Sequence, residues 1–158
     1  MIVVLILLVQ FRFSSQQANI SHSVSGSITT MIINTLKPVV SHIRDTPKWL
    51  LEDELENLIR KVAHFFLFFT LGISLLTVLK LYLSFLKKPL IWLLTLALVV
   101  LFAGIDEWHQ SFIPGREARF TDVIIDVVGA LFAFLCMGVH FALNRFSEFL
   151  HRHFLSHK

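Results

Sequence analysis

The chain has 158 residues, of which 55% are hydrophobic and 16% are charged, whereas a soluble domain carries about 25% charged residues. Together with a mean hydropathy of +0.71, this composition excludes an ordinary soluble domain and indicates a small polytopic membrane protein. The length suits one all-α domain, residues 1–158, with about four transmembrane helices in an antiparallel bundle. The net charge of +3 is scattered, which argues against a nucleic-acid partner and favours membrane lipid.

The first hydrophobic segment, residues 1–13, contains the short apolar run Met1–Val9. This run is shorter than the roughly 20 residues that a spanning helix needs. Three interpretations compete: a signal peptide, an interfacial anchor, and a first spanning helix whose start is clipped by a late start assignment. A basic start and a small-residue cleavage pattern before Ser14 are both missing, so the signal peptide is disfavoured. We favour the clipped spanning helix.

Residues 14–61 are predicted to form an extracytoplasmic loop that contains amphipathic helices. Apolar positions between Val24 and Val39 repeat with a helical period, which indicates a short helix on the membrane surface. Thr46 and Pro47 are typical of a helix start, as the N-cap residue and the first helical residue.

Residues 62–143 are predicted to hold three transmembrane helices, and residues 144–158 a polar cytoplasmic tail. The predicted spans and the segments between them are Val62–Leu86, the basic turn Lys87–Pro89, Leu90–Ile105, the polar segment Asp106–Asp122, and Val123–Leu143. Gly129 and Ala133 form a small-xxx-small pair, which permits close packing of helices in a membrane.

Lysine and arginine set the expected orientation. The Lys87–Pro89 turn and the basic tail should be cytoplasmic, so both termini are predicted to be cytoplasmic in a multi-pass protein of the cell membrane. Three helix ends then bring polar side chains to the opposite face. These candidates for binding are Lys61, His64, Asp106, Glu107, Gln110, Arg116, Asp122 and Asp126.

Asp126 lies just inside the last apolar run, four residues after Asp122, so the two side chains share one helix face. A carboxylate that faces lipid there costs about 3 kcal/mol. Asp126 is therefore expected to face inward and to have a partner. The candidate partners are Arg116, Arg119, Lys61 and His64. A purely structural salt bridge between helices is the alternative to a functional role.

The end of the third predicted span carries a second set of ionisable side chains. Asp106 precedes His109 by three positions and Gln110 by four, so these side chains project together if the helix continues. Asp106, Glu107, His109 and a neighbouring aspartate offer ligand types that suit Zn, Mn or Mg. No recognised ligand spacing such as HExxH accompanies them, and the sequence therefore predicts no metal and no cofactor.

Arg116 follows Pro114-Gly115, a pair typical of a type II turn. A guanidinium group can bind a carboxylate or a phosphate through two parallel hydrogen bonds. Two roles stay open for Arg116, which are to hold the loop to Asp122 or to bind an anionic headgroup.

Several motifs in this order resemble the VanZ-like family of small bacterial membrane proteins. They are Phe13-Ser14-Ser15-Gln16, Arg60-Lys61-Val62-Ala63-His64-Phe65, the run from Asp106-Glu107-Trp108-His109-Gln110 to Pro114-Gly115-Arg116, and Asp122 followed by Gly129. The family often has Asn at the position of Asp126, and a Tyr near Phe68, so this chain departs from the pattern there.

The resemblance implies a cell-membrane protein. Founding members of the family are associated with low-level teicoplanin resistance. It also implies that the site includes Lys61, His64, Asp106, Glu107, Gln110, Arg116 and Asp122. We expect a cell-envelope protein that lowers glycopeptide susceptibility by engaging an anionic component, such as a lipid-linked cell-wall precursor. Two alternatives are a membrane-embedded hydrolase or transferase that uses His64 with Asp106 or Glu107 as catalytic acid–base groups, and an oligomeric transport component. The sequence leaves enzymatic activity and oligomeric state open.

Overall fold

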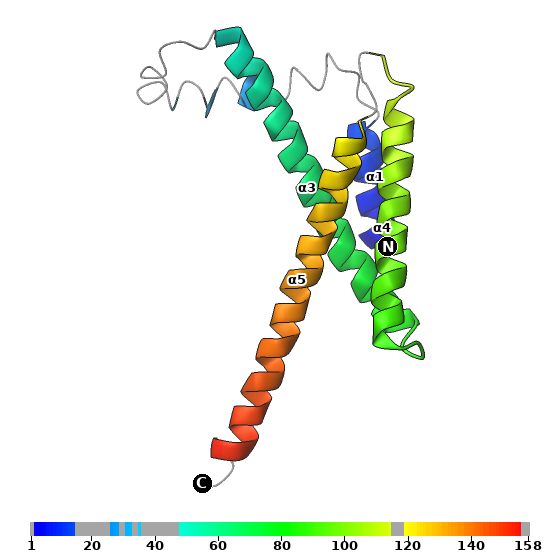
Figure 1. Ribbon diagram of the computed structural model, residues 1–158, viewed down its shortest axis with the longest axis vertical. Helices are drawn as coiled ribbons and strands as arrows, with labels where there is room; N and C mark the ends of the chain where they lie inside the picture. Colours follow the sequence, from blue (N-terminus) through cyan, green and yellow to red (C-terminus); the bar gives the residue numbers. More distant parts are fainter. Residues whose placement is uncertain are drawn as a thin grey trace.

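A computed structural model describes residues 2–14, 26–28, 31–32, 35, 48–114 and 119–155 of the chain. The described part is helical, with α1 at Ile2–Ser14, α3 at Lys48–Tyr82, α4 at Lys88–Gln110 and α5 at Phe120–Leu150 (Figure 1). A π-helical segment, His151–Leu155, continues α5. No strand occurs among the described residues, and the prediction of an all-α protein is confirmed.

Within the described part of the chain, three helices are long and apolar enough to cross a membrane, at Leu55–Tyr82, Lys88–Gln110 and Phe120–His153. The 13 residues of α1 extend only about 20 Å at 1.5 Å per residue, less than the roughly 30 Å of a hydrocarbon core. Even so, Val3, Ile6 and Leu7 of α1 pack against the core. The bundle of a polytopic membrane protein therefore has three long apolar helices and one short one.

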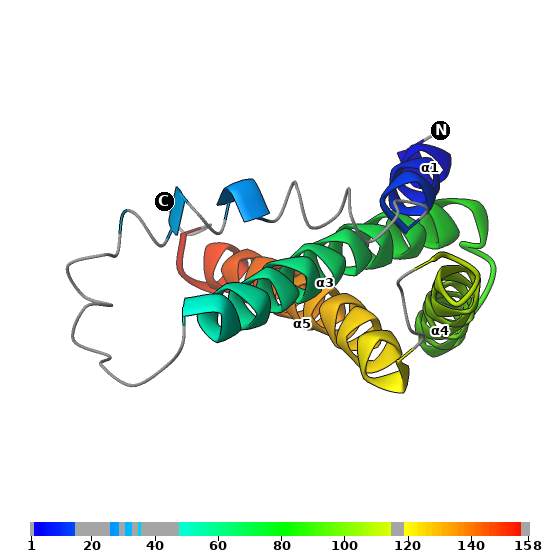
Figure 2. The same cartoon turned by 90° about the horizontal axis from the view of Figure 1, so that it is seen from above.

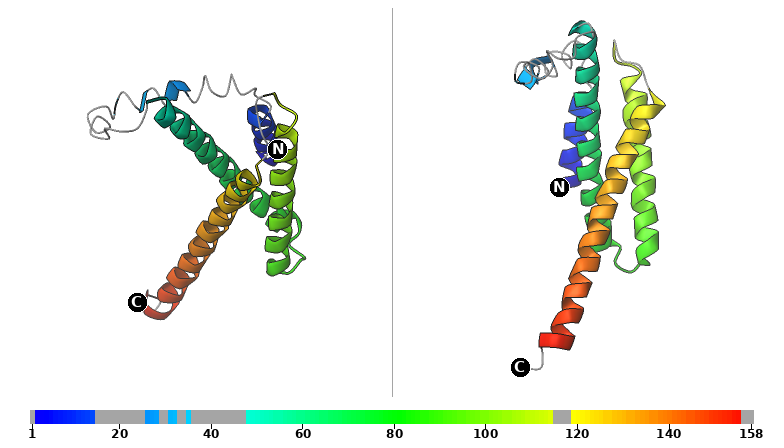
Figure 3. Two further views of the ribbon diagram at one scale, coloured as in Figure 1. Left: turned by 45° about the horizontal axis from the view of Figure 1, so that its top comes forward. Right: turned by 60° about the vertical axis from the view of Figure 1, so that its left-hand side comes forward.

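Helices that follow one another in the chain run in opposite directions, as predicted for an antiparallel bundle (Figure 1). α1 and α4 point one way and α3 and α5 the other (Figure 1), and α3 passes between α1 and α5 when the bundle is seen from above (Figure 2). α3 and α5 cross near their middles, and the C-terminal half of α5 extends away from the other helices (Figure 3). A buried core fills the crossing, formed by Phe68, Leu71, Leu75, Val99, Ala103 and Ala130.

Gly129 permits the close approach of α3 and α5. A Cβ atom added to Gly129 would overlap the carbonyl oxygen of Phe65 and lie 3.1 Å from its carbonyl carbon. About two turns further along α3, a Cβ on Gly72 would lie 3.1 Å from the Cα of Ala130. Small residues at such contacts let helix backbones pack closely in a membrane, and this contact sets the spacing of side chains on both sides of it.

Several helix boundaries differ from the hydropathy-based prediction. α3 already begins at Lys48, so the segment before Val62 is continuous with the predicted span. α5 continues to Leu150, so residues 144–150 of the predicted tail are helical. Hydropathy marks where a helix leaves the apolar layer, whereas backbone hydrogen bonds continue beyond it. The predicted surface helix at 24–39 and the Thr46-Pro47 helix start fall largely outside the described residues.

Candidate functional site

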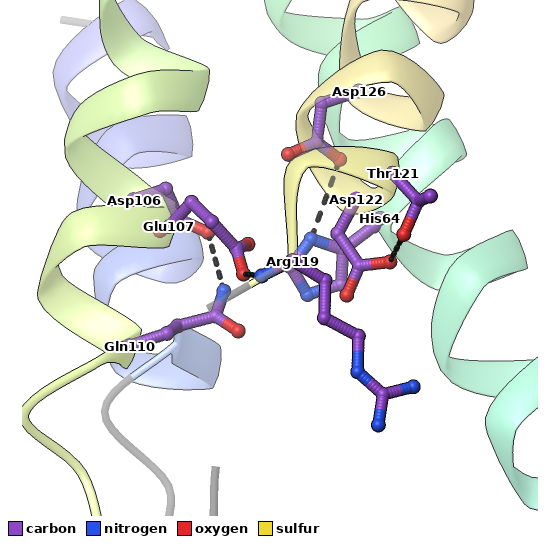
Figure 4. A network of polar contacts seen from close by, with 8 residues as sticks. All are labelled: His64, Asp106, Glu107, Gln110, Arg119, Thr121, Asp122 and Asp126. Carbon is purple, nitrogen blue, oxygen red and sulfur yellow. Dashed lines mark hydrogen bonds and ion pairs between the residues drawn. The ribbon is translucent and has the colours of Figure 1, made fainter. Parts of the chain in front are cut away.

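Polar side chains from three helices meet where α4 ends and α5 begins (Figure 4). We call this group the polar cluster. Its members are Lys61 and His64 of α3, Asp106, Glu107 and Gln110 of α4, Asp122 and Asp126 of α5, and Arg119, which is the N-cap residue of α5. The sequence candidates therefore converge, except for Arg116, which lies outside the described residues.

His64 is the partner of Asp126. Its Nδ1 atom lies 3.3 Å from Oδ1 of Asp126, whose side chain is only 1% exposed, while that of His64 is 13% exposed. Asp126 thus faces the interior and has a partner, as predicted, and of the four partners considered it is the histidine of α3. The contact joins α3 to α5 one turn away from the Phe65–Gly129 contact, so the close backbone approach brings these two side chains together.

Asp106 and Gln110 form a second pair within α4. Nε2 of Gln110 donates a hydrogen bond to Oδ2 of Asp106 at 2.8 Å, and both side chains are buried. The pair exists because α4 continues to Gln110 rather than ending at the last apolar residue. It fixes the orientation of the Asp106 carboxylate.

Glu107 ties the end of α4 to the start of α5. Its Oε1 atom accepts a hydrogen bond from the backbone N–H of Arg119, next to a helix start whose first N–H groups have no partner within the helix. Its Oε2 atom is buried and accepts no hydrogen bond from the described residues. Glu107 therefore links α4 to α5 through Oε1, and Oε2 can accept a further hydrogen bond.

His109 packs against α1, although the sequence grouped it with Asp106 and Glu107. Its ring contacts that of Phe11 of α1 in a tilted arrangement, with centroids 4.7 Å apart and 44° between the ring planes. Its Nδ1 atom is buried and has no hydrogen-bond partner among the described residues. Gln10, also on α1, is buried with 4% exposure, and sequence reasoning missed it. The only available signal was a polar residue at the end of an apolar run.

A small pocket opens at the polar cluster. It is lined by Arg60, Lys61, His64, Asp122 and Ile125. Arg60 is oriented by a hydrogen bond from its Nη2 atom to Oδ1 of Asn57 at 2.9 Å. Two cationic side chains thus stand beside a histidine and a carboxylate, a combination that can hold an anionic group and exchange protons with it.

Three apolar spans and a polar cluster buried at one end of their bundle define a small polytopic α-helical membrane protein. The chain belongs to the VanZ/LLP1 family, whose model matches residues 1–141. No curated protein and no solved structure matches the chain significantly.

Proposed function

We propose that the protein acts in the cell envelope and lowers susceptibility to glycopeptides such as teicoplanin by binding an anionic envelope component at its polar cluster. The class of ligand is a membrane lipid with a phosphate-bearing headgroup, of which a lipid-linked cell-wall precursor is the leading example. The observation that carries the proposal is the pocket that places Arg60 and Lys61 beside His64 and Asp122.

The orientation of the bundle supports contact with the outer leaflet of the cell membrane. The end opposite the polar cluster carries Lys80, Lys87, Lys88 and Arg145. Lys80 lies 4.9 Å from the ring of Trp92, and Lys88 lies 5.2 Å from that of Phe141, an arrangement that suits a membrane interface. Since basic ends stay in the cytoplasm, both termini are cytoplasmic in this proposal, and the polar cluster faces outward.

Lipid binding tests the proposal directly. Purified protein is titrated in nanodiscs against a lipid-linked cell-wall precursor and against phosphatidylglycerol, and bound lipid is counted by native mass spectrometry. We expect binding by the wild type and about fivefold weaker binding by Lys61→Gln, because one cationic contact with an anionic headgroup contributes about 1 kcal/mol. Lys87→Gln, at the opposite end, is the matched control. The absence of lipid binding by the wild type contradicts the proposal.

A second candidate function is hydrolysis or group transfer on a lipid-linked substrate. The contact between His64 and the buried Asp126 favours it, because a carboxylate that orients an imidazole is a common arrangement in general acid–base catalysis. Turnover of the precursor by purified protein, lowered about 10²- to 10⁴-fold in His64→Ala and retained in His109→Ala, supports this function. Binding without turnover favours the first proposal.

A further inference from the structure

We propose that His64, Asp106 and Asp126 bind a divalent transition-metal ion between α3, α4 and α5. Each of these side chains offers one ligand atom, and the three atoms lie within 4.8 Å of one another. They come from three different helices, with His64 directed at Asp126 and Asp106 facing them from α4 (Figure 4). Helical bundles build metal sites in this way, from inward-facing carboxylates and histidines.

The distances fit a metal ion. Bonds of about 2.0–2.1 Å from zinc to nitrogen or oxygen place two ligands of a tetrahedral site about 3.3–3.4 Å apart. The 3.3 Å between Nδ1 of His64 and Oδ1 of Asp126 already matches this edge. The ligand atom of Asp106 lies within 4.8 Å of the other two, so it has to approach them by up to about 1.4 Å when the metal binds.

The burial of the carboxylates gives an independent reason for a cation. Asp106, Glu107 and Asp126 are 7%, 6% and 1% exposed, and no lysine or arginine among the described residues forms an ion pair with them. Oδ2 of Asp126 is buried and accepts no hydrogen bond from the described part of the chain. Buried charges in proteins are paired or coordinate metals, and one imidazole alone does not balance this much negative charge.

The surroundings also suit a metal site. Gln110 holds the Asp106 carboxylate through its 2.8 Å hydrogen bond, as outer partners of metal ligands do. One imidazole and two carboxylates suit Zn²⁺ or Mn²⁺, and Zn²⁺ should bind more tightly. Three protein ligands leave a coordination position open for water or an anionic oxygen. His64 also lines the pocket, so the metal site would adjoin the proposed lipid site, but the metal site itself does not depend on that function.

Metal titration of the purified full-length protein tests this inference without any lipid. After removal of bound ions with a chelator, Zn²⁺, Mn²⁺ and Mg²⁺ are each added, and bound metal is quantified by calorimetry and elemental analysis. We expect one Zn²⁺ per chain, weaker Mn²⁺ binding and the weakest binding for Mg²⁺. Asp106→Asn and Asp126→Asn should each weaken Zn²⁺ binding at least about tenfold, and the exposed-carboxylate control Glu148→Gln should not.

A variant with a changed metal preference keeps the test decisive if the aspartate variants fail to fold. His64→Cys places a soft thiolate ligand in the same position, so we expect a raised preference for Cd²⁺ over Mn²⁺ and a thiolate-to-metal absorption band with Co²⁺. No Zn²⁺ binding by the wild type overturns the inference, as does undiminished binding by folded Asp106→Asn or Asp126→Asn. If both aspartate variants aggregate, an unchanged metal preference in His64→Cys overturns it. If the wild type binds Zn²⁺ but no lipid, the metal-site inference stands and the proposed function is contradicted.

Discussion

At the residue scale, the energetics of the polar cluster centre on His64 and Asp126. Asp126 is 1% exposed and sits where an unpaired carboxylate is costly. Removing one partner from such a pair leaves a buried charge, and this costs more than removing both partners together. The pair therefore holds α3 to α5 even if it serves no chemistry.

We predict that His64→Ala lowers the free energy of unfolding by roughly 1–3 kcal/mol, because it leaves the Asp126 carboxylate buried without its partner. The double variant His64→Ala/Asp126→Ala should be less destabilised than the sum of the single variants, by about 0.5–3 kcal/mol. Reversible unfolding in detergent micelles measures both quantities. His140→Ala, at an exposed position of α5, is the control, expected within about 0.5 kcal/mol of the wild type. Strict additivity of the two changes would mean that the residues do not interact.

The sequence predicted part of this arrangement. The position of Asp126 inside an apolar run was enough to predict that it faces inward with a partner, because the cost of the alternative is large. Choosing that partner among four residues required the rotation of α3 against α5, which hydropathy does not contain. For the same reason, the sequence grouped His109 with Asp106 as possible metal ligands and placed His64 with Asp106 only as an acid–base alternative, whereas His64 is the histidine that approaches both Asp106 and Asp126.

At the element scale, the crossing of α3 and α5 determines where the polar cluster forms. Gly129 contacts the backbone of Phe65, and these two residues are close in sequence to Asp126 and His64. The small-xxx-small pattern predicted a close helix contact at Gly129 but did not identify the opposing helix. The helix ends were predicted less well, because α3 is continuous from Lys48 into the span that hydropathy starts at Val62, and α5 continues through polar residues assigned to a tail.

Replacing Gly129 by alanine should separate α3 from α5. We expect a loss of about 1–3 kcal/mol of unfolding free energy, as for other overpacked contacts, because the added methyl group meets the Phe65 backbone rather than a movable side chain. The matched control is Gly138→Ala on the same helix, where a Cβ meets nothing within 4 Å. That variant should be neutral or slightly stabilised, since alanine favours a helix by about 1 kcal/mol. Thermal unfolding in one detergent compares the two variants, and equal effects would contradict the close contact.

At the scale of the whole molecule, the two ends of the bundle differ in charge. One end joins α4 to α5 at the polar cluster, and the other joins α3 to α4 through Lys87 and Lys88 (Figure 1). The sequence predicted this division, because hydropathy and the distribution of lysine act on whole spans and need no side-chain detail. It also predicted an antiparallel all-α bundle, whereas α1 is shorter than a usual span.

Labelling of single cysteines in intact cells tests which end is exposed outside. In a Cys136→Ser background, we predict that a membrane-impermeant maleimide labels Ser111→Cys beside the polar cluster and does not label Ser84→Cys at the basic end. Both serines are exposed, so the two sites are matched in accessibility. Permeabilised cells should show labelling of both cysteines. The reverse pattern in intact cells would place the polar cluster in the cytoplasm. It would contradict the proposed binding of a ligand at the outer face of the membrane.

Teicoplanin susceptibility in a sensitive host tests whether the polar cluster carries the proposed protective role. The wild type is compared with Lys61→Gln, Asp122→Asn and Arg116→Ala, and with Glu148→Gln as the control, at equal membrane abundance. We predict that the wild type and the control protect the host and that Lys61→Gln and Asp122→Asn, both in the polar cluster, and Arg116→Ala do not. Equal protection by all five proteins, or no protection by the wild type, would contradict that role.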